Sequence, residues 1–323
     1  MTLGRSLRLF LVDGTPNGLL TAEIMNWTGH VLTGPRSKLS ELVQRPECGR
    51  TGIYFLVGPD PDNTLRPLVY IGETDDVGKR LKQHNRPEAQ GGKDFWERVC
   101  LVTSKDQNLT KAHAKYLESL LIRNAKEVGR CGLVNGTAHD YANLPESDRA
   151  DMAFFLEQIR TMLPVLGFDF LRASARYLVA PPEHEGDGAD ISPVFVMNIP
   201  RHGIHASGQE IDGEFFVLKD SMARREWIGT ERGYQSLFQQ LIKDGVIVAG
   251  LDGNCRFVQD HSFSSPSAAA AVVAGRSANG RTKWKLESSG LSYGEWQDGK
   301  VNAALTDETA ASAGDNARPD SFD

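Results

Sequence analysis

Two short apolar runs in the first third of the chain are separated by turn-forming residues. Thr51–Val57 and Leu68–Gly72 have the length and the aromatic and β-branched content of strands. The residues between them, GPDPDNTLRP, are rich in proline and aspartate, which predicts a surface loop. A hairpin of the two strands brings Tyr54 and Tyr70 close enough to share one site.

A helix is predicted directly after the second strand. The segment Glu73-Thr74-Asp75-Asp76 offers N-cap residues for a helix that begins near Val77. Arg80 and His84 are four residues apart on this helix and project from one face. An arginine in such a place binds phosphate through several donors, and a histidine relays a proton. The alternative is a solvated basic helix, because other lysine and arginine residues are close by.

A longer helical pattern spans Leu109–Val128, and a glutamate, Glu118, lies on its apolar face. A carboxylate on an apolar face is costly to bury unless a metal ion or a basic partner compensates for it. Glu118 is therefore a candidate for a metal ligand or for a buried salt bridge. After this helix, Asn135 precedes a glycine, which predicts a turn or an asparagine that orients another group.

Composition divides the chain into segments. Ala180–Pro193 consists largely of proline, glycine and acidic residues, which predicts an exposed linker. In the folded segment that follows, Ser265-Pro266 begins a helix that ends at Gly275. The predicted organisation is an N-terminal strand and helix extension at 1–48, a domain carrying the residues above at 49–145, a helical extension at 146–178, the linker at 179–193, a C-terminal domain at 194–303 and a disordered tail at 304–323.

The charge of the chain is acidic but uneven. The 323 residues include 36 Lys and Arg against 42 Asp and Glu, a formal net charge of −6. Residues 1–145 contain 19 Lys and Arg and 16 Asp and Glu, which gives +3, and the remainder contains 17 and 26, which gives −9. The balance argues against a generic nucleic-acid coat protein, but a mildly basic half is compatible with a nucleic-acid substrate.

Cysteine usage and hydropathy exclude several classes of protein. The four cysteines are scattered and form no CxxC or Cys/His cluster, which argues against a zinc site and a disulfide framework. No apolar run approaches the ~18 residues that a membrane span requires. The first residues contain a short apolar core interrupted by Arg8 and no cleavage site, so they predict a strand rather than a signal peptide. We therefore expect a cytoplasmic protein without membrane contacts.

The order of these features resembles the GIY-YIG nuclease superfamily. Gly52-Ile53-Tyr54 and Tyr70-Ile71-Gly72 are followed by an arginine and a histidine on the next helix, a glutamate within a later helix and then an asparagine, over residues 49–143. The spacer between the tyrosines is a few residues longer than is usual in that family, which an exposed loop accommodates easily. The resemblance implies an α/β (α+β) unit with a central three-stranded antiparallel sheet flanked by helices. A second, smaller α+β domain is expected to follow it.

The resemblance also implies metal-dependent hydrolysis of phosphodiester bonds in DNA. The six site residues of the family correspond to Tyr54, Tyr70, Arg80, His84, Glu118 and Asn135, and Asn143 is an alternative for the asparagine. Glu118 is expected to hold one Mg²⁺ or Mn²⁺ whose other ligands are water and phosphate oxygens. Arg80 is expected to stabilise the transition state. Tyr54 is expected to activate water, shared with Tyr70 or His84, and this requires positive charge nearby because a free tyrosine has a pKa of about 10.

The second half contains a further resemblance. Phe263–Lys285 resembles a domain of unknown function that often follows GIY-YIG nuclease domains, and Gly213–Arg224 fits the same pattern. A looser likeness links it to the restriction-enzyme adenine-methylase-associated domain. The segment is interpreted either as a DNA-recognition module, which includes modified DNA, or as a structural or protein-binding module. Arg281, Lys283 and Lys285 are its candidate phosphate contacts.

Two functions follow from the sequence. The first is a metal-dependent DNA endonuclease of restriction, defence against foreign DNA, or repair. One active site cuts one strand, so a double-strand break would require a dimer or two successive events. The second is a catalytically inactive nucleic-acid-binding or interaction protein on the same scaffold. The complete set of site residues favours the endonuclease.

Overall fold

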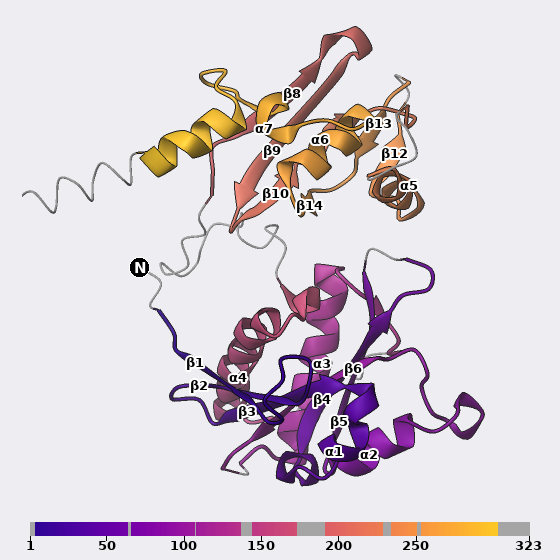
Figure 1. The fold of residues 1–323 in the computed structure, drawn as a ribbon, viewed down its shortest axis with the longest axis vertical. Helices are drawn as coiled ribbons and strands as arrows, with labels where there is room; N and C mark the ends of the chain where they lie inside the picture. Colours follow the sequence, from indigo (N-terminus) through magenta and orange to yellow (C-terminus); the bar gives the residue numbers. More distant parts are fainter. Residues whose placement is uncertain are drawn as a thin grey trace, which may run out of the picture. The chain divides into compact units, whose positions relative to one another are not determined.

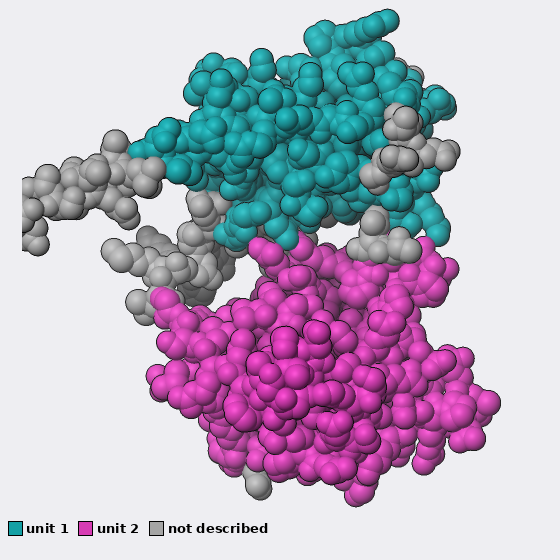
Figure 2. Space-filling model, in the orientation of Figure 1, with its two compact units in different colours: residues 1, 175–323 teal, residues 2–174 magenta. Residues whose placement is uncertain are grey.

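The computed structural model describes residues 4–63, 66–106, 108–136, 144–172, 191–228, 234–250 and 253–302 (Figure 1). The chain divides into two compact units, residues 2–174 and residues 175–323 together with Met1 (Figure 2). Each unit combines helices with β-sheet, so the predicted α+β class is confirmed. The predicted tail and nearly all of the predicted linker lie outside the described residues.

Within the described residues, a seven-stranded sheet forms the centre of the first unit, in the order β1-β2-β3-β6-β4-β5-β7. Its strands are β1 (Leu7–Leu11), β2 (Leu20–Ile24), β3 (Gly29–Pro35), β4 (Gly52–Pro59), β5 (Pro67–Thr74), β6 (Arg98–Ser104) and β7 (Gly132–Leu133). The three antiparallel strands expected after residue 49 are β6, β4 and β5. They lie inside a larger sheet than expected because β3 pairs with β6 along its whole length. The three strands between residues 7 and 35 therefore extend this sheet.

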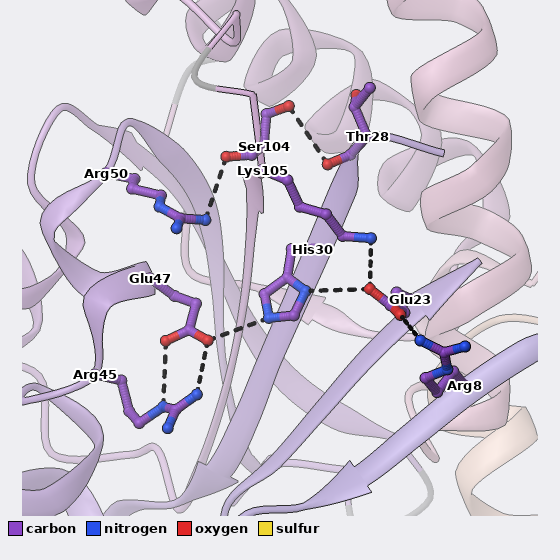
Figure 3. Close-up of polar contacts among 9 residues, drawn as sticks. All are labelled: Arg8, Glu23, Thr28, His30, Arg45, Glu47, Arg50, Ser104 and Lys105. Carbon is purple, nitrogen blue, oxygen red and sulfur yellow. Dashed lines mark hydrogen bonds and ion pairs between the residues drawn. The ribbon is translucent and has the colours of Figure 1, made fainter. Parts of the chain in front are cut away.

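A polar cluster connects the first strands to the rest of the sheet (Figure 3). His30 on β3 contacts Glu47 through Nε2 at 3.1 Å and Glu23 on β2 through Nδ1 at 4.0 Å. Arg45 donates hydrogen bonds to both Glu47 oxygens, at 2.9 and 3.2 Å. Burial acts to raise the pKa of Glu47, but the hydrogen bonds from His30 and Arg45 outweigh it and lower this pKa to about 2. Lys105, directly after β6, pairs with Glu23, so the cluster joins β2, β3 and β6.

Helices cover both faces of the seven-stranded sheet (Figure 1). They are α1 (Leu39–Leu42), α2 (Val77–His84), α3 (Lys111–Val128) and α4 (Glu146–Val165). The odd-numbered apolar side chains of β4 and β5 pack with α3 and α4. The even-numbered Tyr54 and Leu56 pack with α1 and α2 on the other face, as the alternation of side chains along a strand requires. Asp76 caps α2 by accepting a hydrogen bond from the Lys79 N–H at 2.8 Å.

The second unit contains two antiparallel sheets within the described residues, ordered β14-β10-β9-β8-β15 and β11-β13-β12. Its strands are β8 (Phe195–Ile199), β9 (Ile204–Ile211), β10 (Glu214–Val217), β11 (Met222–Ala223), β12 (Ile247–Ala249), β13 (Cys255–Phe257), β14 (His261–Phe263) and β15 (Lys285–Leu286). Its helices are α5 (Gln235–Lys243), α6 (Pro266–Ala274) and α7 (Gly280–Lys283). Ser265 caps α6 through the Ala268 N–H, and Gly275 ends α6 in the left-handed conformation, as predicted.

Each unit has its own hydrophobic core. The buried clusters of the first unit end at Leu171, and the cluster of the second unit begins at Phe195. Helix α6 lies at the centre of the second core, where every residue from Ala268 to Ala274 is buried. Among the described residues, the structure contains no helix with the length and apolar character of a membrane span.

Candidate active site

The two tyrosines lie on the face of the sheet that α2 covers. Tyr54 on β4 pairs with Gly72 on β5, and Tyr70 pairs with Leu56, so the tyrosines are diagonal neighbours. Their ring centroids are 6.1 Å apart. A Cβ atom added at Gly72 would lie 2.3 Å from the Tyr54 hydroxyl oxygen. The glycine of the second triplet therefore makes room for the tyrosine of the first.

The Tyr54 hydroxyl is shared by two side chains of α2. Tyr54 Oη lies 2.8 Å from His84 Nε2, and Arg80 Nε donates a hydrogen bond to the same oxygen at 3.3 Å. The phenol donates to Nε2 when His84 carries its proton on Nδ1, and it accepts from Nε2 in the other tautomer. The His84 ring also meets Tyr70 edge-on, with centroids 5.3 Å apart. The predicted i, i+4 pair of α2 thus converges on the two predicted tyrosines.

Burial sets the protonation of this cluster. Tyr54 is fully buried, and burial together with Tyr70 raises the pKa of Tyr54 far above its ordinary value, against the lowering effect of Arg80. Burial, Arg80 and Lys93 lower the pKa of His84 to about 4. At neutral pH a neutral phenol therefore shares a hydrogen bond with a neutral imidazole. The other ring nitrogen, His84 Nδ1, is buried and has no hydrogen-bond partner among the described residues.

The pKa direction of Tyr54 bears on its expected role. Activation of water by Tyr54 requires positive charge that lowers the pKa of the phenol, whereas in this structure burial raises it. The base closest to the phenol proton is His84 Nε2. A neutral Tyr54 that takes up a proton must at the same time give one up, and His84 Nε2 is in position to accept it.

Lys93 is a member of the cluster that the sequence did not reveal. Its Nζ lies 4.3 Å from the centroid of the Tyr70 ring, and its backbone N–H donates to the His84 carbonyl at 2.8 Å. Burial and Arg80 lower the pKa of Lys93. Lys93 lies outside the predicted strands and helices, so no periodicity linked it to Tyr70. It adds a second positive charge to the face that carries Arg80.

Asn135 completes the outer edge of β5. Its Oδ1 accepts a hydrogen bond from the Ile71 N–H at 2.9 Å, and its Nδ2 donates to the Ile71 carbonyl at 2.7 Å. Because β7 pairs with Leu68 and Val69, the Asn135 side chain continues that pairing along the same edge. It satisfies two backbone groups that an edge strand would otherwise leave unpaired. The alternative asparagine, Asn143, lies outside the described residues.

Glu118 contacts the same edge of β5, beyond the point that Asn135 occupies. Its carboxylate accepts a hydrogen bond from the backbone of Glu73, two residues beyond Ile71. Burial, followed by the Glu73 carboxylate, raises the pKa of Glu118 to about 7, whereas Lys111 and Arg80 act in the opposite direction. Lys111 pairs with Glu73 at 2.6 Å. The site therefore contains two neighbouring carboxylates, of which Glu73 is partly neutralised by a lysine.

This pair of carboxylates is suited to a hydrated divalent cation. A cation beside Glu118 would offset the burial and the carboxylate repulsion that raise its pKa. Mg²⁺ is commonly held by one or two carboxylates and several waters. Among the described residues, no group of three or more His, Cys, Asp and Glu is arranged to hold a metal ion. Alternation along β5 places Glu73 on the α3 side with Val69 and Ile71, which is the sequence signal that would have identified it.

The six predicted residues gather around β5 and α2. Tyr54, Tyr70, Arg80 and His84 form one contact cluster. Glu118 lies on α3, outside that cluster, and the charge of Arg80 acts to lower the pKa of Glu118. Asn135 supports the β5 backbone between them, and its side-chain amide is already engaged there.

Comparison with known proteins identifies part of the second unit. Residues 195–297 match the family model described as a domain of unknown function (DUF4357). This match confirms the C-terminal domain of unknown function that the sequence motifs predicted. No curated protein and no solved structure matches the chain.

Proposed function

We propose that residues 49–145 form a metal-dependent endonuclease that hydrolyses phosphodiester bonds in DNA, with the chemistry of the GIY-YIG superfamily that its motifs resemble. The observation that carries the proposal is the hydroxyl of Tyr54, which contacts both Arg80 and His84 and lies beside Tyr70. Hydrogen-bonding side chains of β4, β5 and α2 converge here inside an otherwise apolar cluster, where a purely structural core would favour apolar side chains. Restriction, defence against foreign DNA, and repair are the processes that such an enzyme would serve.

The metal proposed is Mg²⁺ or Mn²⁺ at Glu118, with Glu73 as the nearest additional carboxylate. The raised pKa of Glu118, about 7, supports this placement because the charged form of this group lacks compensation. A bound divalent ion would stabilise negative charge on the phosphoryl group and on the leaving oxygen. Lys111 neutralises Glu73 and limits the total negative charge of the site.

The protein side chains have separable roles in this proposal. Arg80 is half-buried, so its guanidinium can donate to a phosphoryl oxygen in a medium that screens charge poorly. Tyr54 passes its proton to His84 Nε2 as it accepts one from the attacking water, which leaves hydroxide, a neutral phenol and an imidazolium. The pKa of His84, about 4, leaves the imidazole neutral beforehand but also makes it a weak base, so the transfer requires this pKa to rise when the negatively charged phosphate binds.

One observation favours the alternative function, a nucleic-acid-binding or interaction protein without catalysis. The Tyr54 side chain is fully buried, so water does not reach its hydroxyl in the described conformation. Catalysis therefore requires a small movement of Tyr70 or α2 when DNA binds. The alternative requires no such movement and no metal.

The test is nicking of supercoiled plasmid in Mg²⁺ or Mn²⁺, with a chelator as the control. We expect metal-dependent nicking by the wild-type protein and none by Glu118→Ala. The matched control is Glu127→Ala, which removes an exposed carboxylate from the same helix and should nick normally. Nicking at the wild-type rate by Glu118→Ala would exclude Glu118 as the metal ligand. DNA binding without any nicking by the wild type would favour the alternative function.

A further inference from the structure

A cleft of about 300 Å³ opens on the second unit. Three segments that are distant in the sequence form it: His202 at the end of the turn between β8 and β9, Arg224–Glu226 after β11, and Asn254 before β13. Nothing in the proposed nuclease chemistry uses these residues.

Backbone contacts hold the walls of the cleft in place. The Asn254 side chain donates to the His202 carbonyl at 3.0 Å. The Arg224 N–H donates to the Val273 carbonyl of α6 at 2.9 Å. Gly275, with a φ of +60°, lets the end of α6 approach the arginine segment, since a Cβ atom there would lie 2.5 Å from the Glu226 carbonyl. These contacts tie the walls to α6 and to each other, although the lining residues themselves are half-buried or exposed.

Positive charge is concentrated around this cleft. Arg224 and Arg225 line it. Burial, followed by the positive charges of Arg224, Arg201 and Arg276, lowers the pKa of His202, so these three cations lie near enough to act on the imidazole. Among the described residues, none of these four arginines forms an ion pair with a carboxylate. Repulsion between unpaired like charges in one place is unfavourable, and a bound anion would relieve it.

The positive charge around the cleft is local and does not follow from the composition of the domain. Residues 195–297 contain 11 Lys and Arg and 11 Asp and Glu, a net charge of zero. Glu226 also lines the cleft, and its single carboxylate leaves an excess of positive charge there. By contrast Arg281, a predicted phosphate contact, is paired with Asp298 at 2.9 Å and with Gln297.

We infer that this cleft binds a backbone phosphate of duplex DNA. Arginine side chains present several N–H donors in a planar fork that matches phosphate oxygens. Contacts of this kind fix the position of a protein on DNA without reading the sequence. The choice of DNA as the polyanion rests on the proposed function. The cleft would then position the second unit on the substrate of the first.

The test measures binding of full-length protein to a fluorescent DNA duplex in chelator, where cleavage cannot interfere. Arg224→Gln and the more exposed Arg225→Gln should each weaken binding by roughly threefold to tenfold at low salt, and each should reduce the slope of log affinity against log salt by about one. The control is Lys243→Gln, which removes the same charge from an exposed position on α5 of the same unit. Arg225 provides a second variant in case Arg224→Gln impairs folding.

The outcomes separate the cleft from the nuclease proposal. Unchanged affinity and salt slope in both cleft variants, or an equal loss in Lys243→Gln, would overturn the inference whatever the nicking assay gives. Loss of binding in the cleft variants alone supports the cleft even if the wild type never nicks plasmid. Thermal unfolding at increasing concentrations of inorganic phosphate tests whether the cleft binds a free phosphate ion instead of DNA. Suppose that phosphate stabilises the wild-type protein, that Arg224→Gln abolishes this stabilisation, and that Arg224→Gln still binds DNA with wild-type affinity. This result would assign the cleft to a free anion and overturn the DNA assignment.

Discussion

The Cβ atom that Gly72 lacks would lie 2.3 Å from the hydroxyl oxygen of Tyr54. The two residues pair across β4 and β5. A side chain at position 72 would therefore displace the Tyr54 ring and break its contacts with Arg80 and His84. A glycine is therefore required at position 72 by the side chain of another strand, although its own backbone conformation is ordinary.

Gly72→Ala should destabilise the first unit by about 1–3 kcal/mol, the usual cost of overpacking a core. It should also abolish nicking because the phenol is displaced. Denaturant unfolding and plasmid nicking measure the two effects. Gly136→Ala is the control, since no atom lies within 4 Å of a Cβ added there. Equal stability of the two variants would show that Tyr54 occupies a different position.

Asn135→Ala should lower stability by about 1–3 kcal/mol, because two backbone groups of Ile71 lose their partners. Hydrogen exchange of the Ile71 amide should become faster, which a purely catalytic residue would not cause. Asn135→Asp keeps the acceptor for the Ile71 N–H but turns a carboxylate oxygen toward the Ile71 carbonyl, so at neutral pH it should destabilise at least as much as Asn135→Ala. Unchanged exchange at Ile71 together with lost nicking would instead place Asn135 in contact with the substrate.

Glu118→Gln should stabilise the metal-free protein at pH 8 but hardly at pH 5. The Glu118 carboxyl keeps its proton up to about pH 7 in the folded chain, against 4.5 in the unfolded chain. Folding therefore takes up a proton between these values, and wild-type stability falls as the pH rises through this window. Glutamine has no proton to lose. The gain should be about 1 kcal/mol, since solvent screens a half-buried group.

Addition of Mg²⁺ at pH 8 should make the wild type more stable than Glu118→Gln. A cation that binds only the folded state raises the stability of the wild type, whereas Glu118→Gln has lost the charged ligand. Thermal unfolding at pH 5 and pH 8, with Mg²⁺ or with chelator, provides all four comparisons. If the difference in stability between the wild type and Glu118→Gln is the same at both pH values and with or without Mg²⁺, Glu118 is not a cation ligand.

A fragment of residues 2–174 should fold on its own and retain metal-dependent nicking. Its buried clusters end at Leu171 and include no residue of the second unit. The full chain should bind DNA more tightly than this fragment or show a substrate preference that the fragment lacks. Parallel assays of both proteins at fixed salt measure this difference. An insoluble fragment would contradict independent folding.

Local patterns in the sequence were sufficient for the elements that carry the site. The hairpin of β4 and β5, the cap of α2 by Asp76 and the helix that carries Glu118 follow from periodicity and capping signals. The i, i+4 spacing of Arg80 and His84 correctly indicated a shared face, since both contact Tyr54.

Contacts between distant segments were not accessible in the same way. The pairing of β3 with β6 and the contact of Asn135 with Ile71 depend on which strand edges remain free, which no local window reveals. The raised pKa of Tyr54 arises from complete burial, which the sequence around Tyr54 does not predict. The cleft of the second unit combines residues from His202 to Asn254 and is visible only in three dimensions.

The central claim is that the Tyr54 hydroxyl belongs to a working nuclease site. The most direct measurement is the single-turnover rate of plasmid nicking in Mg²⁺ by Tyr54→Phe, which removes one oxygen atom. Tyr116→Phe is the control, because the Tyr116 hydroxyl forms no hydrogen bond among the described residues. We predict a rate for Tyr54→Phe that is lower by ~10²-fold or more, with DNA affinity unchanged and Tyr116→Phe at the wild-type rate. Nicking by Tyr54→Phe at the wild-type rate would contradict the account.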